Sequence, residues 1–498
     1  MAETDSGVMT CMPEKKKTML SIALVAAIWL TAGLSQTRAD GDCESGAVGP
    51  VPDPAFGDGG LVMEQFHVGD DLGDLGIAAA VQSDGRLVVG GHASTPDDAR
   101  DGAVMRLLPD GQPDPEFGDE GRLLLGIANP GDFVSVRGVE VLADGRIVLV
   151  GRDRDTGWFF ARLHPDGSFD TSFDLNGVRI ISLDADSHFA HDLAVQADGK
   201  LVGAGFVQES FDVDEVCAKL IRLDSDGSND ETFGENGQVC LTPDEDADIA
   251  GALDVTVLPD GRILAAGLGS QADSSPELKL DMLAFRLMPD GQVDTTFGED
   301  GWRFIVFDQG GEFHDRAFAL TVDSSDRLVL AGFAESLQSS ESNFVTSMAA
   351  ARLTPDGDPD PGFGSGGRVT VAFDHDGEHH GVDQAAGLTV LDDGRILLAG
   401  VAPRRHSADT FPQAGAATVL HADGDLDTCF GDDGRWVQSL PGPQDIGLFR
   451  DIAHHSDRIY LVGYGDVPQT DDPSRTRTDI MITAMTISGE IFSDRFEE

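Results

Sequence analysis

The chain has 498 residues, of which 40% are hydrophobic and 61 are glycine, so it is long enough to bury a large core. Acidic residues number 88 against 34 basic residues, which gives a formal charge of -54 at pH 7. This excess of negative charge argues against binding of nucleic-acid phosphates or an anionic membrane surface through a basic face. We therefore expect no nucleic-acid partner.

The first segment of the chain is typical of a secretory signal peptide. Lysines at 15–17 precede an apolar run over 19–34, and a small-residue cleavage site ends at Ala39. The run is shorter than the roughly 20 residues that cross a bilayer, so a retained anchor is the weaker interpretation and the mature chain should have no membrane span. Translation can also begin downstream, at Met9 or Met12.

Four cysteines remain after cleavage, an even number that suits an oxidising compartment: Cys43, Cys217, Cys240 and Cys429. Cys217 and Cys240 fall on consecutive expected strands joined by a tight connection, so they form the favoured disulfide. Cys43 with Cys429 is then the second pair. Four buried free thiols are the alternative.

Three short motifs recur along the chain and indicate internal repetition. The first is D-x-x-F, which in all copies but one is followed by Gly and which always has a second Gly four residues after the Phe. Its seven copies are Asp53/Phe56, Asp114/Phe117, Asp170/Phe173, Asp230/Phe233, Asp294/Phe297, Asp360/Phe363 and Asp427/Phe430.

The second motif is D-G-R or D-G-K followed by a hydrophobic run, and it begins at Asp84, Asp144, Asp198, Asp260 and Asp393, with degenerate copies at Ser325 and Ser456. Asp-Gly between apolar segments is typical of a tight β-hairpin. The third motif is R-L-x-P-D-G, which begins at Arg106, Arg162, Arg286 and Arg352, with variants at Arg222 and Val419 and a decayed copy at Met485.

Together the motifs predict four short strands in every repeat of roughly 60 residues, which is typical of propeller blades. We therefore expect an all-β fold, a seven-bladed β-propeller of four-stranded antiparallel blades. Small apolar segments such as 77–81 and 193–195 suit the innermost strands. The chain begins with an outer strand (61–66) and ends on a third strand (479–487), so the N-terminal outer strand should complete the last blade and close the ring.

These motifs in combination resemble the delta-60 repeat family, secreted or surface-associated bacterial proteins with predicted β-propeller repeats. The resemblance covers residues 51–490 and implies the propeller fold but no activity and no catalytic residues. The copies that begin at Ser325 and Ser456, and the Phe173-Asp174 pair, depart from the motifs. We expect the repeated Asp to accept backbone N–H groups within its turn, and the repeated Phe to pack between blades.

The chain thus divides into a signal peptide (1–39), an N-terminal segment (40–53), the propeller (54–490) and a tail (491–498). The tail resembles the I-F-x-D-G-F-E ending of some Gram-negative secreted proteins, with Arg495 in place of Gly, although a remnant of the repeat is equally compatible. The expected localisation is therefore the periplasm, the cell surface or the medium of a bacterium.

Non-repeated polar clusters are the candidate sites, because a single site needs asymmetry between blades. We expect them in the connections between an outer strand and the next inner strand, where carboxylates at alternate positions suit calcium. The candidate metal ligands are Asp244, Asp246 and Asp248 in one connection and Asp374, Asp376, Glu378 and His380 in another. Similar clusters are Asp184, Asp186, His188 and His191, and Glu312, His314 and Asp315. Solvated acidic loops are the alternative.

No stretch matches a catalytic signature such as G-x-S-x-G, H-E-x-x-H or a Walker loop. We therefore expect a monomeric, non-catalytic binding or adhesion scaffold for an extracellular protein or glycan. The alternative is a hydrolase or lyase with a site at the mouth of the propeller channel, since propeller sites can combine residues far apart in sequence.

The acidic connections give a first prediction. If they hold calcium, added calcium raises the melting temperature of the purified protein and a chelator lowers it, because a ligand that binds only the native state stabilises it. A differential scanning experiment with both additions tests this. Identical melting curves under both conditions would rule out the cation.

Overall fold

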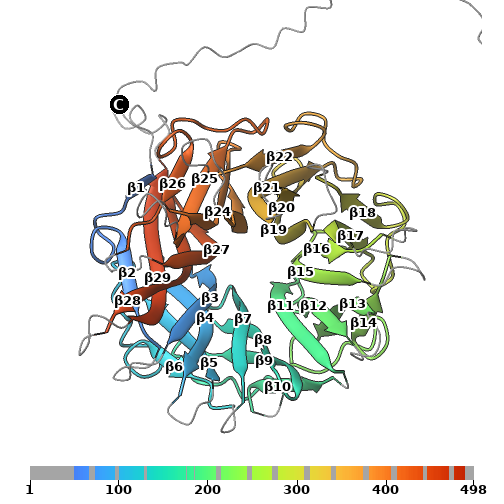
Figure 1. Ribbon diagram of the computed structural model, residues 1–498. Helices are drawn as coiled ribbons and strands as arrows, with labels where there is room; N and C mark the ends of the chain where they lie inside the picture. Colours follow the sequence, from blue (N-terminus) through green and yellow to red (C-terminus); the bar gives the residue numbers. More distant parts are fainter. Residues whose placement is uncertain are drawn as a thin grey trace, which may run out of the picture. The chain divides into compact units, whose positions relative to one another are not determined.

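The computed structural model describes residues 50–66, 73–95, 100–127, 132–174, 176–183, 185–208, 215–243, 249–271, 279–307, 314–337, 344–373, 381–404, 412–440, 446–469 and 476–487. The chain divides into residues 1–45 and a compact unit over residues 46–498, and all the described residues belong to the second. Their regular elements are all strands, and Figure 1 shows them arranged as a ring. Over these ranges no helix has the length and hydropathy that crossing a membrane requires.

The strands form seven sheets, which are the blades of the propeller. Blade 1 contains β3 (Asp74–Val81), β4 (Leu87–Ser94), β5 (Arg100–Leu107) and β6 (Arg122–Leu124). Blade 2 contains β7 (Val134–Val141), β8 (Ile147–Asp153), β9 (Gly157–Leu163) and β10 (Val178–Ser182). Blade 3 contains β11 (Ser187–Val195), β12 (Leu201–Gln208), β13 (Val216–Leu223) and β14 (Gln238–Leu241). Blade 4 contains β15 (Ala250–Val257), β16 (Ile263–Gly269), β17 (Asp281–Leu287) and β18 (Trp302–Ile305).

Blade 5 contains β19 (Arg316–Val322), β20 (Leu328–Leu337), β21 (Phe344–Leu353) and β22 (Arg368–Val371). Blade 6 contains β23 (Gln384–Val390), β24 (Ile396–Pro403), β25 (Gln413–Leu420) and β26 (Arg435–Val437). Blade 7 contains β27 (Gly447–His455), β28 (Arg458–Pro468) and β29 (Thr476–Ile487), together with β1 (Pro50–Pro52) and β2 (Leu61–Glu64).

Each blade runs outward from its inner strand in chain order, with antiparallel pairing throughout. Blade 7 takes its outer edge from the N-terminal side, because β1 pairs with residues 485–487 of β29 and β2 with residues 480–483. The seven-bladed, all-β fold is confirmed, and the pairing of both segments agrees with closure by the N-terminal strand. β1 lies within the segment 40–53, so the sheet begins before the boundary at residue 54 that the sequence predicts.

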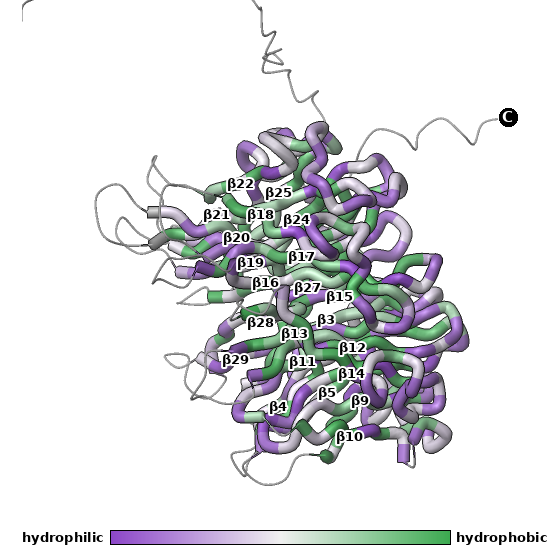
Figure 2. Tube along the Cα trace, turned by 90° about the vertical axis from the view of Figure 1, so that its right-hand side faces the viewer, coloured by the Kyte–Doolittle hydropathy of each residue, from purple (hydrophilic) through white to green (hydrophobic). Residues whose placement is uncertain are grey.

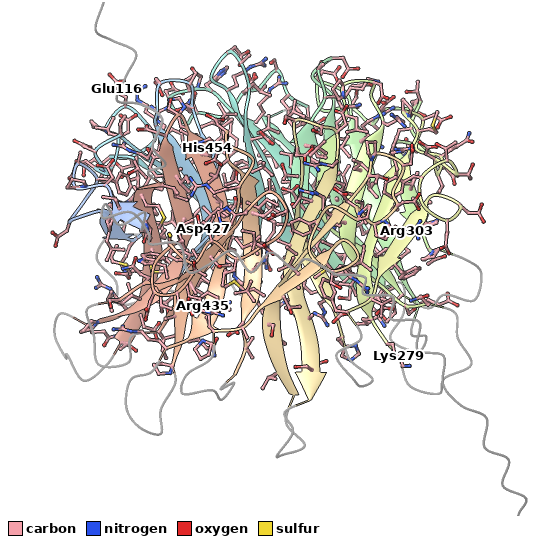
Figure 3. The ribbon with its side chains drawn as sticks, turned by 90° about the horizontal axis from the view of Figure 1, so that it is seen from above. Glu116, Lys279, Arg303, Asp427, Arg435 and His454 are labelled. Atoms are coloured by element: carbon pink, nitrogen blue, oxygen red, sulfur yellow. A yellow bond between two sulfur atoms is a disulfide. The ribbon has the colours of Figure 1, made fainter. Side chains whose placement is uncertain are left out.

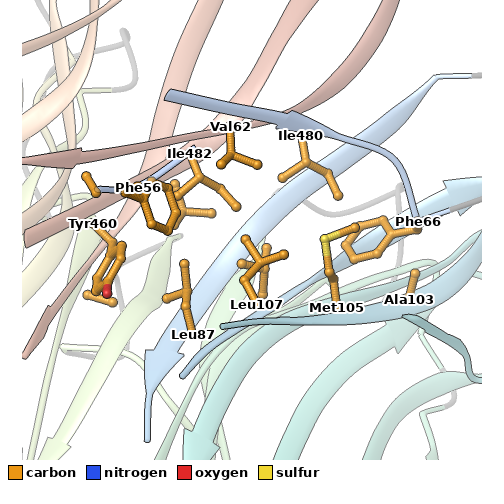
Figure 4. Close-up of a cluster of buried hydrophobic side chains, with 14 of the residues drawn as sticks. Phe56, Val62, Phe66, Leu87, Ala103, Met105, Leu107, Tyr460, Ile480 and Ile482 are labelled. Carbon is orange, nitrogen blue, oxygen red and sulfur yellow. The ribbon is translucent and has the colours of Figure 1, made fainter. Parts of the chain in front are cut away.

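Hydrophobic packing joins the blades, since consecutive inner strands contact one another and β27 contacts β3 across the junction of the ring. Figure 2 shows the apolar residues along the strands and hydrophilic ones at the turns. At the closing junction Phe56 and Val62 from the N-terminal side pack with Leu87 and Met105 of blade 1 and with Tyr460 of blade 7 (Figure 4). The two ends of the chain are therefore held by a shared core as well as by hydrogen bonds.

The repeated Phe packs between blades, as the sequence predicts. Phe117 is fully buried among Val136, Ile147 and Phe159 of the next blade, and the Phe residues of all the D-x-x-F turns are at most 1% exposed. An aromatic ring of this size removes a large apolar area from water, so each turn anchors its blade to the following one.

The repeated Asp has a larger role than the capping that the sequence predicts. Asp230 Oδ1 accepts a hydrogen bond from the backbone of Thr232 at 2.9 Å, which is the expected turn contact. Its Oδ2 also pairs with Arg222 Nε at 2.6 Å and with Lys200 Nζ at 2.8 Å. These cations come from the R-L-x-P-D-G and D-G-R motifs, so one carboxylate joins all three motifs of a repeat.

The same arginine reaches the next blade. The guanidinium of Arg222 lies 4.5 Å from the ring centre of Phe233, and its Nη1 donates to the carbonyl oxygen of Pro289 in blade 4. Equivalent groups of Asp, Arg and Phe occur around Asp114, Asp170, Asp294 and Asp360. We call this group of side chains the blade staple.

The Phe173-Asp174 departure changes little in the backbone. The residue after the repeated Phe donates its N–H to a carbonyl of the next blade, as Gly118 does to Asp166 at 2.9 Å. Gly118 has a φ of 54°, and a Cβ there would lie 2.2 Å from the carbonyl oxygen of Arg122. Asp174 makes the equivalent bond to Asp226 at 2.7 Å with a φ of 50°, a conformation that Asp tolerates better than most residues.

Cys217 of β13 and Cys240 of β14 form a disulfide with their Cα atoms 5.4 Å apart, which is the pair that the sequence favours. Cys429 is also disulfide-bonded. Cys43 lies outside the described residues, so its pairing with Cys429 stays a prediction.

The blade staple predicts how the fold responds to loss of a buried carboxylate. Asp294→Asn should lower the free energy of unfolding by about 3 kcal/mol, because it leaves Arg286 and Arg262 without their shared anion. Chemical denaturation at pH 7 measures the change. The matched control is Asp358→Asn, which breaks an exposed ion pair with Arg303 and should cost at most about 1 kcal/mol.

Acid should have the corresponding effect on the wild type. Burial alone would raise the pKa of Asp294, but hydrogen bonds from Thr296 and Arg286 outweigh it and hold that pKa at about 2. Because the folded pKa lies below the unfolded one, this stability is present above about pH 4 and is lost as the pH falls towards 2. For the two variants at pH 7, an equal decrease in the free energy of unfolding for Asp294→Asn and Asp358→Asn would contradict a structural role for the staple.

Candidate functional site

The propeller has two chemically different ends. The D-G-R, P-D-G and D-x-x-F turns lie at one end, which we call the turn end, and Glu116 and His454 mark it in Figure 3. The connections from the second to the third strand and from one blade to the next lie at the opposite end, the loop end, which Lys279 marks. The repeated motifs occupy the turn end, whereas the connections at the loop end differ from blade to blade.

The predicted metal ligands cannot be placed at either end. All of them lie outside the described residues: Asp244, Asp246, Asp248, Asp374, Asp376, Glu378 and His380. In the described part of the chain no group of three or more His, Cys, Asp or Glu side chains is arranged to hold a metal ion. A calcium site in these two connections therefore stays a prediction.

Two of the predicted cluster residues occupy a different element from the one expected. His188 and His191 belong to the inner strand β11, not to the connection that precedes it. The other described cluster also adjoins a strand, because His314 and Asp315 come directly before β19. The strands therefore begin earlier than the polar residues suggest, and His191 is brought to the axis of the ring.

A β-bulge interrupts the inner strand of every blade and fixes which residue lies at its centre. Each shift of register leaves one residue unpaired, and these bulge residues are Ile77, Arg137, His191, Leu253, Phe318, Ala386 and Arg450. A bulge re-aims a side chain and often adjoins a functional site. Charged or ionisable residues occupy this position only in blades 2, 3 and 7.

Arg137, His191 and Arg450 influence one another across the axis. Burial lowers the pKa of Arg137 to about 10, and the positive charges of Arg152 and Arg450 add to this effect. Blades 2 and 7 are not adjacent, so Arg137 and Arg450 meet on the axial side. Burial also lowers the pKa of His191 to about 3, with further contributions from the same arginines, so this imidazole is neutral at physiological pH.

Aromatic rings extend this basic group towards the loop end. The guanidinium of Arg152 lies 3.9 Å from the ring centre of Phe189, which in turn stacks on Phe206 at 4.8 Å. The ring of His191 stacks on Phe206 at 5.5 Å. On the other side of the group Arg450 Nη2 donates to the hydroxyl of Tyr464 at 3.2 Å. We call Arg137, Arg152, His191, Arg450 and Tyr464 the axial basic group.

Carboxylates that follow the bulges in the chain form a second layer, nearer the turn end. Asp192, Asp254 and Asp451 each accept an N–H from the inner strand of the next blade, at 3.1, 2.7 and 2.7 Å. Burial and then repulsion from Asp192 and Asp451 raise the pKa of Glu140 to about 7. Burial likewise raises the pKa of Asp451 to about 7, with Asp192 adding to the rise.

Asp192 and Asp254 are hydrogen-bonded to each other, which requires a proton between their carboxyl groups. Burial raises the pKa of Asp192, and burial together with the charge of Asp192 raises that of Asp254 well above its usual range. Glu140 and Asp451 are therefore partly protonated at neutral pH, and burial favours the protonated forms of Asp192 and Asp254 as well. The layer connects blades without supplying full negative charge to the arginines.

A hollow of about 380 Å³ between β22 and β26 is a weaker candidate. Its two arginines already serve the fold, because Arg435 Nε donates to the carbonyl of Ala372 at 2.6 Å and Arg368 donates to that of Val306. The axial basic group is thus the candidate site that the described residues support. Of its members only His191 is among the sequence candidates, since the others occur as single residues without a motif.

Four segments match the family model described as "Domain of unknown function (DUF5122) beta-propeller", over residues 82–117, 142–173, 196–233 and 258–297. Each match runs from just before a D-G-R or D-G-K turn to the Phe of the following D-x-x-F turn. The chain therefore carries β-propeller repeats of this type in blades 1 to 4, while the delta-60 name remains a resemblance. No curated protein matches the sequence.

Solved structures that are similar to the chain include the polysaccharide lyase Uly1, with 11% identity over 83% of this chain and 90% of that one and a TM-score of 0.44. A puromycin hydrolase has 14% identity over 85% of this chain and 55% of that one, with a TM-score of 0.45. The α-L-arabinofuranosidase Arb93A from Fusarium graminearum has 10% identity over 70% and 92%, with a TM-score of 0.38. At these values the likenesses carry no argument about ligand or reaction.

The carboxylate layer predicts a dependence of stability on pH opposite to that of the blade staple. The folded pKa of Asp451, about 7, lies above its unfolded value of about 3.9, so its contribution is present at low pH and is lost as the pH rises through 7. Asp451→Asn should therefore flatten the fall in melting temperature between pH 5 and about pH 8. The control is the exposed Asp110→Asn, and an unchanged slope for Asp451→Asn would contradict the shift.

Proposed function

We propose that this protein is an extracellular binding propeller whose ligand docks at the loop end, over the axial basic group. One observation carries the proposal: the repeated side chains are used within and between blades, whereas unrepeated basic and aromatic side chains gather at the axis and extend towards the loop end. Side chains that serve the fold in every blade cannot distinguish a ligand. Side chains that occur in only some of the blades can give one part of the ring its own ligand specificity.

An extracellular location is supported by two features of the chain. The Cys217–Cys240 disulfide suits an oxidising compartment, and the basic, apolar and small-residue pattern of residues 15–39 is typical of an exported protein. The rigid ring also suits a scaffold, because a binding surface on a preformed fold loses less entropy when the ligand docks.

A hydrolase or lyase is the second candidate, and Glu140 is the observation in its favour. A carboxyl group with a pKa near 7 is suited to donate or accept a proton at neutral pH. His191 argues in the other direction, because an imidazole with a pKa of about 3 is a weak base at that pH. Binding without chemistry is therefore the better supported function.

Blocking one end of the ring at a time tests the proposal. Asp155→Cys places a thiol in the exposed connection between β8 and β9 at the loop end, and Ser83→Cys places one in the exposed turn between β3 and β4 at the turn end. Each variant is coupled to a polyethylene glycol maleimide and applied to glycan and peptide arrays. The first conjugate should lose the binding that the unmodified protein shows, because the polymer covers the axis.

The Ser83 conjugate is the matched control and should bind like the unmodified protein. Equal binding by both conjugates, or loss only in the Ser83 conjugate, would place the ligand elsewhere. Absence of any array ligand for the unmodified protein, combined with turnover of a glycoside or ester substrate, would favour the enzymatic candidate.

A further inference from the structure

The axial basic group carries positive charge that its own surroundings do not balance. Arg137, Arg152 and Arg450 lie close enough to depress one another's pKa or that of His191. Over the described residues neither Arg137 nor Arg152 forms an ion pair with a carboxylate, although the charge of Asp155 acts on Arg152, and the Nε atoms of both arginines are buried without a hydrogen-bond acceptor. A buried, unpaired donor costs about 1 to 3 kcal/mol, more for a charged group.

The staple arginines differ from Arg137, although Arg179 and Arg316 also bury an Nε atom without an acceptor. The chain has 88 acidic residues, and the staple arginines such as Arg222 each hold a carboxylate at less than 3 Å. The charge of Asp155 reaches Arg152, whereas the other carboxyl groups at the axis belong to the layer that includes Asp192 and Asp451. Because their protonated forms are favoured, they offer little neutralisation. An anion brought by a ligand would satisfy the guanidinium groups instead.

Groups that can accept a hydrogen bond accompany these donors. The Nε2 atom of His191 and the Nδ1 atom of His188 are buried and have no partner among the described residues. A neutral imidazole presents one donor and one acceptor, and the hydroxyl of Tyr464 presents both. A ligand with a carboxylate alone would use only the hydrogen-bond donors of the protein. A ligand with hydroxyl groups beside its carboxylate would use the protein's donors and acceptors together.

The surrounding charge narrows the ligand class further. A protein with a formal charge of -54 repels densely charged polyanions, so the favoured ligand carries an isolated carboxylate on an otherwise neutral body. An amino acid is disfavoured because its ammonium group would face the arginines. A hydroxylated ring with a single carboxylate meets all of these requirements.

We propose that the axial basic group binds a uronic acid, with Arg137 and Arg450 on the carboxylate and with His191 and Tyr464 on the ring hydroxyls. Guanidinium groups suit this role because their paired N–H donors match the two oxygens of a carboxylate. The inference rests on the proposed function and names the chemistry of its ligand. The sugar can be free or can be one residue of an extracellular glycan.

Calorimetric titration and thermal shift measurements with defined probes test the inference. Sodium glucuronate should bind to the full chain and raise its melting temperature, whereas glucose, which lacks the carboxylate, should do neither. A short oligosaccharide in which glucuronate alternates with neutral sugars should bind as well if the sugar belongs to a chain. Binding of the monomer alone assigns a free sugar acid, and both results support the site.

Arg137→Met is the diagnostic variant, because it removes the charge and keeps much of the side-chain volume. It should weaken glucuronate binding about tenfold or more, the effect of losing a charge-assisted pair. Without ligand its melting temperature should stay the same or rise, since repulsion within the group is relieved. A purely structural arginine would instead lower that temperature on removal.

Arg316→Met is the matched control on the inner strand of blade 5. Burial lowers the pKa of Arg316, but the charge of Glu335 opposes the shift, so this arginine has a compensating neighbour. Its removal should leave glucuronate binding unchanged. Equal loss of binding in both variants would overturn the assignment to the axial basic group.

Three results would overturn the inference itself: no binding of glucuronate or of the alternating oligosaccharide, equal binding of glucose, or equal binding of cyclohexanecarboxylate, which has one carboxylate on a ring without hydroxyls. These outcomes remain distinct from failure of the proposed function. If neutral glycans or peptides bind and the Asp155 conjugate blocks them, the loop end is still the binding face and only the uronic acid is excluded.

Discussion

The fold depends on one buried carboxylate per repeat. In the blade staple the Asp of the D-x-x-F turn holds an arginine from the third strand and a second cation from the D-G-R turn, as Asp170 holds Arg162 at 2.7 Å and Arg146 at 3.0 Å. The first arginine also covers the buried Phe and donates to a carbonyl of the next blade. Among the described residues the backbones of neighbouring blades meet only at single bridges and turn contacts, such as Arg100 with Phe133, so the staple contacts and the hydrophobic packing hold most of each blade against the next.

The variant copies show which part of the staple is indispensable. In blade 6 Val419 replaces the arginine of the third strand, and Asp427 keeps Arg395 at 3.1 Å, with His421 at 3.9 Å. In blade 7 Asp53 pairs with Arg458, and the ring of Tyr460 packs edge-on against Phe56 at 5.5 Å. The cation of the D-G-R turn is thus retained in every blade, while an aromatic or aliphatic side chain can replace the other arginine.

The repetition made the fold predictable from sequence, because each copy of a motif reports the same local contact. The copies of D-G-R, P-D-G and D-x-x-F locate the turns, and the four antiparallel strands of each blade lie between these turns. The pairing of Asp230 with Arg222 and Lys200 was not predicted, although the recurrence of a cation in two motifs beside a recurrent Asp was a signal for it. An acidic and a basic residue that recur together at a fixed spacing in every repeat can be predicted to form an ion pair.

The candidate site could not be found in this way, for a physical reason. A bulge moves the register of the inner strand by one residue, and nothing in the sequence of β7 or β27 marks Arg137 or Arg450 as the residue displaced. The bulge position holds arginine in only two of the seven blades, so no repeated motif marks it. A single site requires that asymmetry. The scaffold fixes the bulge in every blade but leaves its side chain free to vary, and here arginine or histidine occupies the position in blades 2, 3 and 7.

The two axial layers also constrain each other. Full ionisation of Asp192, Asp254, Asp451 and Glu140 would place four like charges around one axis, and the raised pKa values show that the fold avoids this by retaining protons. Among the described residues no carboxylate shifts the pKa of Arg137, whereas the charge of Asp155 acts on Arg152. Burial of the acids, together with repulsion among them, therefore favours their protonated forms, and this weakens them as partners for the arginines and leaves Arg137 available to an external anion.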